Sequence, residues 1–393
     1  MDLDSSPQTE ALRARLLDLI SSEAPKIHLR NGTRVVEDPA EWAAWRRWSA
    51  RLYEEQFVGR NWPVEYGGVP DPSPIDEYTV AMEIAKARVP PLLYFATYAA
   101  HAIINFCSED VKQDLLPKTR SSEIVWCQLF SEPSGGSDLA ALRTRAERRG
   151  DVYVVNGQKV WNTGAQYADF GLLLARTSTE GSKHGGITAF VIDMRQPGVV
   201  VRPIREITGT HDFNEVFLAD AVVPVAHRVG GEGEGWKVAN AVLAKERINT
   251  AAYGASTRSA MDDLLEIARE KLAQGEALAD GLRHKLVDLH AACQISNLLG
   301  LALASREQSG KGRMQDPPIA KCFFADTNLG VGLLAMSLLG EDALYFEGDD
   351  CARDSGRWPD RFLYARTYTI AGGSSEILRN VIAERVLRMP RGD

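Results

Sequence analysis

The chain is poor in cysteine and in positive charge, and it has no long apolar run. Its five cysteines among 393 residues are scattered and form no Cys-x-x-Cys pair, so neither a disulfide framework nor a cysteine zinc site is indicated. Lys and Arg (45) are outnumbered by Asp and Glu (53), for a net charge of −8, which argues against a nucleic-acid-binding protein. The most apolar stretches, near 295–304 and 331–340, fall short of the roughly 20 residues that cross a bilayer, so no membrane span is expected.

Targeting and metal-binding signals are also scarce. The first residues, Met1–Ser6, are acidic and lack the basic start and apolar run of a secretory signal. Scattered, unpaired cysteines are typical of the cytoplasm, where we expect the protein to work. His101, His211 and His290 have no partner at ligand spacing, so no metal site is predicted.

Three patterns of secondary-structure preference follow one another along the chain. Apolar residues recur at helical spacing from about Thr9 to Ser122, short β-rich runs fill the middle, and long helical patterns return from Gly235. These patterns predict domains over 1–122, 123–232 and 233–393. Helices that precede and follow the strands, rather than alternate with them, argue against a doubly wound sheet.

The middle pattern predicts a small barrel or sandwich. Strands are predicted at Val152–Val155, Phe170–Leu174, Ile187–Ile192, Val199–Val201 and Glu215–Leu218. The dipeptide Asn156-Gly157, which lies between β-favouring residues, predicts a hairpin turn.

Five segments together carry a family resemblance. They are Gly59–Gly68 (GRNWPVEYGG), Phe130–Asp138 (FSEPSGGSD), Asn156–Thr163 (NGQKVWNT), Phe213–Pro224 and Gly372–Asn380 (GGSSEILRN). In order and spacing they resemble the acyl-CoA dehydrogenase family along nearly the whole chain. The resemblance implies an N-terminal all-α domain, a central small β-barrel domain and a C-terminal four-helix bundle. It also implies an FAD-dependent oxidoreductase of lipid metabolism that removes two hydrogens from the α and β carbons of an acyl-CoA thioester.

The residue types in these segments suit a flavin. The small residues Ser134-Gly135-Gly136 allow close backbone approach to a ligand, and the indole of Trp161 offers a flat surface for stacking. The alternating run Lys159–Thr163 predicts that Trp161 and Thr163 share one strand face. Taken alone, the same residues are also compatible with a plain tight turn and with a tryptophan of the core.

The resemblance assigns cofactor-binding roles residue by residue. Phe130 and Ser131 would lie along the flavin ring, and Trp161 and Thr163 would cover one flavin face. Gly136 and Ser137 would meet the flavin or the pantetheine arm of the substrate. Ser374 and Glu376 would contact the FAD of a neighbouring subunit, while Ser374 or Ser375 also suits the cap of a helix. A dimer or tetramer is therefore expected. The residues implied to bind FAD are Phe130, Ser131, Gly136, Ser137, Trp161, Thr163, Ser374 and Glu376.

The reaction needs a carboxylate that removes the α proton. Many family members carry a glutamate just before the glycine of the last segment, but Gly372 stands there in this chain. Others carry it on the first helix of the C-terminal domain, where this chain has Glu246. Glu246 continues the apolar stripe of Trp236, Ala239 and Leu243. A glutamate on such a face is unfavourable unless it is paired or useful, and burial would raise its pKa toward that of a general base.

The predicted catalytic residues are therefore Glu246 and Gly372. The Gly372 N–H would polarise the thioester carbonyl, and Arg247 would contact the substrate together with Ser137. A glutamate that ends the stripe and pairs with a nearby Lys or Arg is the other interpretation of Glu246.

Two family elements are missing. The Arg-x-x-Phe-Gly element that touches FAD across the interface is replaced by 269–275, and a Gln-x-x-Gly-Gly element is replaced by 337–341. The adenosine end of FAD would then be held differently, or by a different partner chain. The expected partners are an electron-transfer flavoprotein and either a second copy or a related chain.

The substrate and the electron acceptor stay open. A helix-borne glutamate favours a bulky or branched acyl-CoA as the substrate, and an acyl group on a carrier protein is an alternative substrate. A flavin oxidase or monooxygenase relative would be rapidly reoxidised by oxygen. A half-site subunit of a heteromeric dehydrogenase would lack the yellow colour of bound flavin until its partner is added.

Overall fold

The computed structural model describes residues 6–27, 29–30, 36–93, 95–250 and 254–390, with the backbone alone for 246–250. The chain forms two compact units. One contains Met1–Gly32, Ser73–Pro90 and Glu246–Asp393, and the other contains Thr33–Pro72 and Pro91–Lys245. The N-terminal part of the chain is therefore divided between the two units.

The unit that contains Pro91–Lys245 is built on an eight-stranded sheet. The strand order is β6-β7-β3-β2-β4-β5-β8, with β1 paired to β4. The strands are β1 (Trp126–Leu129), β2 (Arg145–Arg149), β3 (Val152–Lys159), β4 (Phe170–Arg176), β5 (Ile187–Asp193), β6 (Val199–Pro203), β7 (Asn214–Pro224) and β8 (Arg228–Val229). Neighbours are mostly antiparallel, whereas β1 and β2 each run parallel to β4. All five strands predicted from the sequence are present.

Alternate residues of β4 enter two different apolar cores. Leu172 and Leu174 belong to an outer core shared with helices, whereas Leu173 and Ala175 belong to an inner core enclosed by strands, as a period of two requires. Because both faces of β4 are buried, its sequence is a continuous apolar run. The inner core is the interior of the small barrel that the resemblance implied.

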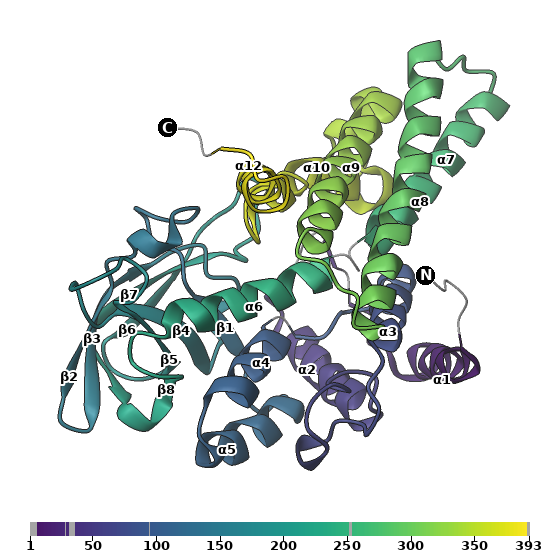
Figure 1. Ribbon diagram of the computed structural model, residues 1–393. Coiled ribbons are helices and arrows are strands. Elements are labelled where there is room, and N and C mark those ends of the chain that lie inside the picture. Colours follow the sequence, from purple (N-terminus) through teal and green to yellow (C-terminus); the bar gives the residue numbers. More distant parts are fainter. Residues whose placement is uncertain (1–5, 28, 31–35, 94, 251–253, 391–393) are drawn as a thin grey trace. The chain divides into compact units, whose positions relative to one another are not determined.

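Helices cover the outer core. The helices of this unit are α2 (Pro39–Glu54), α4 (Ala96–Phe106), α5 (Glu109–Arg120) and most of α6 (Gly235–Thr250). Ile103, Leu116 and Val242 bring α4, α5 and α6 into that core, beside the sheet in Figure 1. The boundary between the units passes through α6, after Lys245.

Asn156-Gly157 is not a hairpin turn, contrary to the sequence prediction. It lies inside β3, where the pairing with β7 shifts register between Val155 and Gly157. A Cβ atom on Gly157 would lie 2.4 Å from Thr144 Oγ1, so glycine permits a close approach of two backbones at a bulge. The turn that joins β2 to β3 lies at Gly150 instead.

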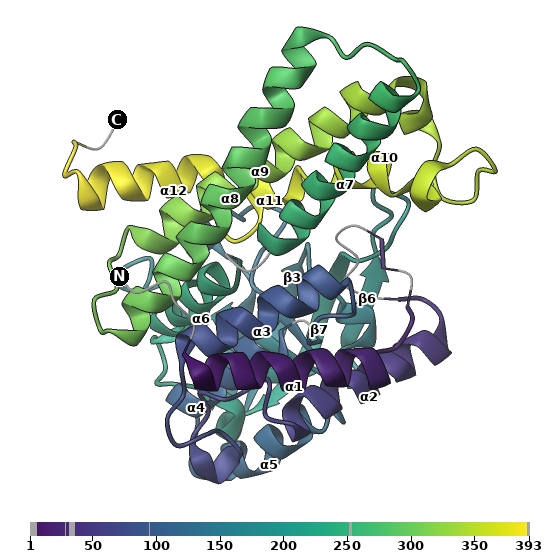
Figure 2. The ribbon, with the colours of Figure 1, turned by 90° about the vertical axis from the view of Figure 1, so that its right-hand side faces the viewer.

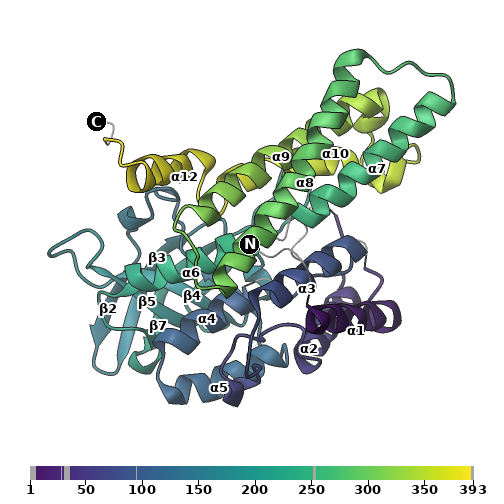
Figure 3. The same ribbon diagram turned by 45° about the vertical axis from the view of Figure 1, so that its right-hand side comes forward.

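The other unit is helical in its described residues. Its helices are α1 (Pro7–Glu23), α3 (Pro74–Ala87), α7 (Gly254–Ala273), α8 (Asp280–Gln308), α9 (Asp316–Leu339), α10 (Arg357–Tyr364), α11 (Thr367–Ile370) and α12 (Ser375–Val381). Leu264, Cys293 and Leu334 bring α7, α8 and α9 into one core, and these helices lie side by side in Figure 3. The early helices α1 and α3 pack together (Figure 2), and α3 packs on α7 and α8. The implied order of helical, β and helical segments is confirmed.

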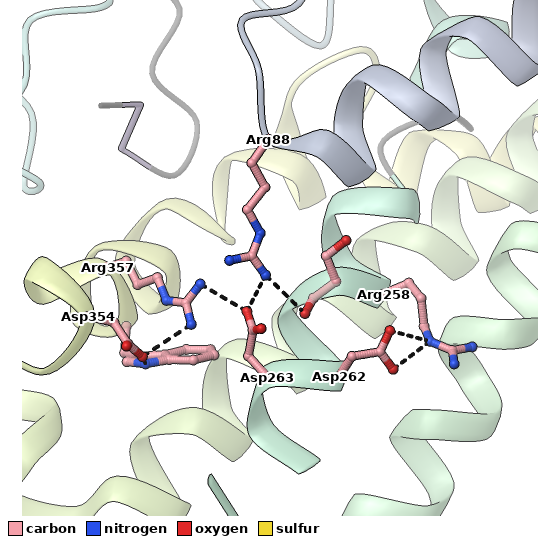
Figure 4. Close-up of polar contacts among 8 residues, drawn as sticks. Arg88, Arg258, Asp262, Asp263, Asp354 and Arg357 are labelled. Atoms are coloured by element: carbon pink, nitrogen blue, oxygen red, sulfur yellow. Dashed lines mark hydrogen bonds and ion pairs between the residues drawn. The ribbon is translucent and has the colours of Figure 1, made fainter. Parts of the chain in front are cut away.

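Ion pairs connect early and late segments of the helical unit. Figure 4 shows Arg88, which follows α3, and Arg357 of α10 both paired with Asp263 of α7. Arg357 also pairs with Asp354 at 3.1 Å, and Trp358 Nε1 donates to Asp354 at 2.8 Å. Partly exposed pairs of this kind contribute about 0–1 kcal/mol each, so the apolar core dominates the stability of the unit.

Within the described residues, α8 and the stretch Asp316–Leu344 are long and apolar enough, by length and composition, to cross a membrane. Core helices pass the same test, and these stretches contribute Cys293 and Val331 to the core of the helical unit. The expectation that the chain has no membrane span stays a prediction.

Candidate active site

The first predicted flavin segment begins where β1 ends. Glu132 and Gly135 close a tight turn through two backbone hydrogen bonds of 3.0 Å. Among the described residues, a Cβ atom built on Gly136 would meet the Ser131 Oγ at 4.0 Å and nothing nearer. The backbone is therefore open to a ligand at this point, with the Ser131 hydroxyl beside it. Ser137 is exposed.

The second predicted segment follows the end of β3. Because β3 ends at Lys159, strand alternation does not extend to Trp161 and Thr163. Trp161 has a φ of 62° and is 59% exposed, whereas Thr163 is 7% exposed. The prediction that these side chains share a strand face is therefore wrong. A bulky residue at positive φ costs about 1–3 kcal/mol and is a frequent feature of ligand sites. The exposed indole is available for stacking.

Hydrogen bonds join the two segments. The Val160 N–H donates to the Ser131 carbonyl at 3.0 Å. Lys159 Nζ donates to the Phe130 carbonyl at 3.1 Å and to Glu132 Oε1 at 2.8 Å. Phe130 itself is 4% exposed in the outer core. The structure therefore joins the backbone at Phe130 and Ser131 to Lys159 and Val160, the residues that directly precede Trp161.

The ion pair is fully enclosed. Burial lowers the pKa of Lys159 to about 8, against the opposing effect of Glu132. Burial alone would raise the pKa of Glu132, but Lys159 and hydrogen bonds from Thr144 and Arg143 outweigh it and leave that pKa lowered. Both groups are therefore charged near neutral pH. Nothing in the local sequence predicts this pair, because Glu132 lies 27 residues from Lys159 along the chain.

The helical unit contains the other predicted residues. Gly372 and Gly373 have φ values of 69° and 94°, and they join α11 to α12. Ser374 caps α12, since its Oγ accepts a 3.3 Å hydrogen bond from the Ile377 N–H. Glu376 is exposed in the first turn, and its pKa is lowered first by its own backbone N–H and then by Ser374. The capping role expected of Ser374 is confirmed.

The predicted base and its neighbour lie in α6 by backbone position. The side chains of Glu246 and Arg247 fall outside the described residues. Of the predicted stripe that precedes them, Ala239 is fully buried, whereas Trp236 and Leu243 are only partly buried against the outer core. The fully buried face of α6 is formed by Val238, Ala239 and Val242.

A pocket of about 490 Å³ lies beside α4 and is lined by residues that include His101, Ile104, Lys245 and parts of the loop 61–72. Burial, then Lys245, lowers the pKa of His101. Ile104, which lines the pocket, also packs against the outer core that contains Phe130. Among the residues whose side chains are described, no predicted site residue lines the pocket, and Lys245 directly precedes Glu246 in the sequence.

Known proteins match the chain along nearly its full length. Sequence profiles of the acyl-CoA dehydrogenase N-terminal, middle and C-terminal domains match residues 7–123, 127–221 and 233–387. The chain is 34% identical over 349 residues to the acyl-CoA dehydrogenase IpdE1 of Mycobacterium tuberculosis, covering 88% of each chain. The chain belongs to the acyl-CoA dehydrogenase family.

Two solved structures whose descriptions name a pair of proteins have the same fold. The structure described as Tcur3481-Tcur3483 steroid ACAD matches with a TM-score of 0.89 and 27% identity, covering all of both chains. The ChsE4-ChsE5 complex from Mycobacterium tuberculosis matches with a TM-score of 0.83 and 28% identity, again over all of both chains.

As an acyl-CoA dehydrogenase, the protein is an oxidoreductase with FAD as its cofactor. The described residues fit a flavin, since the exposed Trp161 indole and the open backbone at Gly136 belong to segments tied together through Ser131. Where the family's Arg-x-x-Phe-Gly element is missing, the chain forms the end of α7. Arg269 and Lys271 pair locally, with Glu266 and Glu276, whereas Glu270 pairs with the distant Arg353.

Proposed function

We propose that this acyl-CoA dehydrogenase converts an acyl-CoA to the trans-2-enoyl-CoA, with Glu246 as the general base. The observation that carries the proposal is the exposed Trp161 indole at positive φ, joined by hydrogen bonds to the Ser131 segment. Family membership supplies the reaction class. The absence of a carboxylate at Gly372 leaves the helix-borne Glu246 as the family's other solution.

The chain's residues have distinct tasks in this reaction. Glu246 takes the α proton, and the Gly372 N–H donates to the thioester oxygen, where negative charge develops as the α proton leaves. Bound FAD supplies the hydride acceptor for the β carbon. Trp161, Ser131 and the backbone at Gly136 orient that group and exclude water from it. An electron-transfer flavoprotein then takes up the electrons.

A bulky acyl group is the proposed substrate. The structure described as a steroid acyl-CoA dehydrogenase shares 27% identity with this chain over its full length. A glycine at 372 also occupies less space than the glutamate found there in other members, and it leaves room for a larger acyl group near the base.

A related chain is the proposed partner, in addition to a second copy. The structural neighbours Tcur3481-Tcur3483 and ChsE4-ChsE5 each contain two kinds of chain. Val287, Ile295 and Leu298 of α8 are 68%, 46% and 51% exposed and share one helix face by their spacing. An apolar stripe of this kind is typical of a subunit interface. Together with these two-chain neighbours, the stripe supports the half-site subunit as the second candidate function.

Anaerobic titration of the purified protein with a panel of acyl-CoAs tests the function, with flavin bleaching as the measurement. We expect bleaching with bulky acyl groups, and no bleaching in a Glu246→Gln variant that retains FAD. Full turnover by the Glu246→Gln protein would remove Glu246 from the mechanism. Rapid reoxidation of the reduced flavin by oxygen would favour an oxidase. If the protein retains flavin only when it is co-expressed with a related chain, the half-site subunit is favoured.

A further inference from the structure

α9 contains a buried lysine. Lys321 is 2% exposed in a helix whose buried residues are mostly apolar, such as Phe324 and Val331. Moving an ammonium out of water costs several kcal/mol unless its donors are well satisfied. A lysine in this position therefore points to a contact on which the fold or the site depends.

One contact of Lys321 is with the glycine loop of the candidate active site. Lys321 Nζ donates a 2.7 Å hydrogen bond to the Gly373 carbonyl oxygen. The next residue of α9, Cys322, directs its Sγ at the Ser375 carbonyl at 3.8 Å. α9 therefore contacts the loop backbone on both sides of Ser374.

The elements that flank the loop are fixed without the lysine. The Ala371 N–H donates to the Thr367 carbonyl at 2.8 Å, and the Leu378 N–H donates to the Ser374 carbonyl at 2.9 Å. These bonds close the end of α11 and the start of α12. The backbone that local bonds leave least constrained is the glycine pair, because glycine has the widest choice of φ and ψ.

We propose that Lys321 is a positioning residue, which holds the loop in the conformation where the Gly372 N–H can donate to the thioester oxygen. This inference rests on the function proposed above. The Gly373 carbonyl belongs to the planar peptide unit that joins the two positive-φ glycines to the cap at Ser374. A charged donor on that carbonyl fixes the plane of the unit and restricts the adjoining dihedral angles. It thereby limits the directions in which the preceding N–H groups can point.

The position of the contact distinguishes this role from packing alone. A lysine needed for the fold of α9 could meet any carbonyl or carboxylate within reach. Lys321 instead meets the segment where the sequence departs from the family, with glycine in place of glutamate. With no side chain at Gly372 to anchor the loop, the restraint on its backbone comes from the facing helix.

The test compares Lys321→Met, Lys321→Arg and a control, Lys285→Met, which removes an exposed lysine of α8. Two measurements are made on FAD-loaded protein: steady-state kcat and KM, and the carbonyl stretch of a bound acyl-CoA by isotope-edited infrared difference spectroscopy in a Glu246→Gln background. We expect Lys321→Met to lower kcat roughly tenfold to a hundredfold, which is below the loss of an entire oxyanion donor. KM and FAD content change less than twofold, and the carbonyl band moves towards that of the free thioester. Lys321→Arg, which keeps a cationic donor, restores part of both signals.

A wild-type carbonyl band and kcat in folded Lys321→Met would overturn the inference. If Lys321→Met does not fold, Lys321→Gln takes its place with the same expected direction. A failure of both variants to fold would show that the lysine serves the fold alone, which also overturns the inference. Failure of the proposed function is recognised separately, because the wild-type protein itself would then fail to bleach with any acyl-CoA.

Discussion

Removing the Lys159 ammonium tests the physical basis of the flavin segment. In Lys159→Met the carboxylate of Glu132 stays buried, and it loses the partner that now lies 2.8 Å away. The Phe130 carbonyl also loses its 3.1 Å donor. Breaking a buried pair by removing one partner typically costs about 3–5 kcal/mol, because the remaining charge is uncompensated.

The expected loss is large enough for thermal unfolding to resolve. For a unit of this size, about 1 kcal/mol changes Tm by roughly 2–4 °C, so Lys159→Met should lower Tm by roughly 6–20 °C. The assay follows circular dichroism and FAD release during heating. FAD should leave first, because the altered segment carries Ser131.

Two companion variants make the result decisive. Adding Glu132→Gln to Lys159→Met should recover most of the loss, because no buried charge is then left unpaired. Lys183→Met is the matched control, since it removes an exposed lysine paired with Asp138 at 2.7 Å and should cost about 0–1 kcal/mol. Equal Tm values for Lys159→Met and Lys183→Met would refute the reasoning.

Three further predictions concern the same unit. Trp161→Ala should weaken FAD binding about tenfold, with Trp161→Phe close to wild type, because aromatic stacking is worth about 0.5–1.5 kcal/mol. The fluorescence of released flavin measures the FAD affinity, and equal affinities of Trp161→Ala and wild type would contradict a stacking role. Gly157→Ala should lower the free energy of unfolding by about 1–3 kcal/mol, because its Cβ would lie 2.4 Å from Thr144 Oγ1. An unchanged midpoint of chemical denaturation would show that the backbone at the bulge moves to accommodate the methyl group. The lowered pKa of Glu132 adds stability that is present above the unfolded pKa of this carboxyl, near 4.5, and is lost as pH falls through the folded pKa. Below pH 4.5, the free energy of unfolding should therefore fall less steeply with pH in Lys159→Met/Glu132→Gln than in the wild type. Parallel curves of unfolding free energy against pH would argue against the lowered pKa.

Most of the barrel could be predicted from the sequence, since β4 and β5 are apolar runs buried on both faces. β2 could not, because four of its five residues are charged and the strand is mostly exposed. Asn156-Gly157 has the composition of a hairpin, yet the close approach of Thr144 that makes it a bulge depends on a residue 13 positions from Gly157.

For the site, the sequence indicated which segments come together, but not the hydrogen bonds and ion pairs that fix them. Trp161 was expected on a strand face, and the positive φ that exposes it is set by the tertiary fold. Lys159 and Lys321 carry no local signal of their partners, because Glu132 and Gly373 are 27 and 52 residues away along the chain. Long-range hydrogen bonds of this kind lie beyond periodicity and spacing.

The division of the early helices has a consequence for biosynthesis. α1 and α3 leave the ribosome first, but the helices on which α3 packs, α7 and α8, begin at Gly254. The unit that contains the sheet ends at Lys245, and all eight strands, the last of which ends at Val229, are synthesised before those later helices. The barrel can therefore be complete while the apolar faces of α1 and α3 still await their partners, a period in which a chaperone would protect the nascent chain from aggregation.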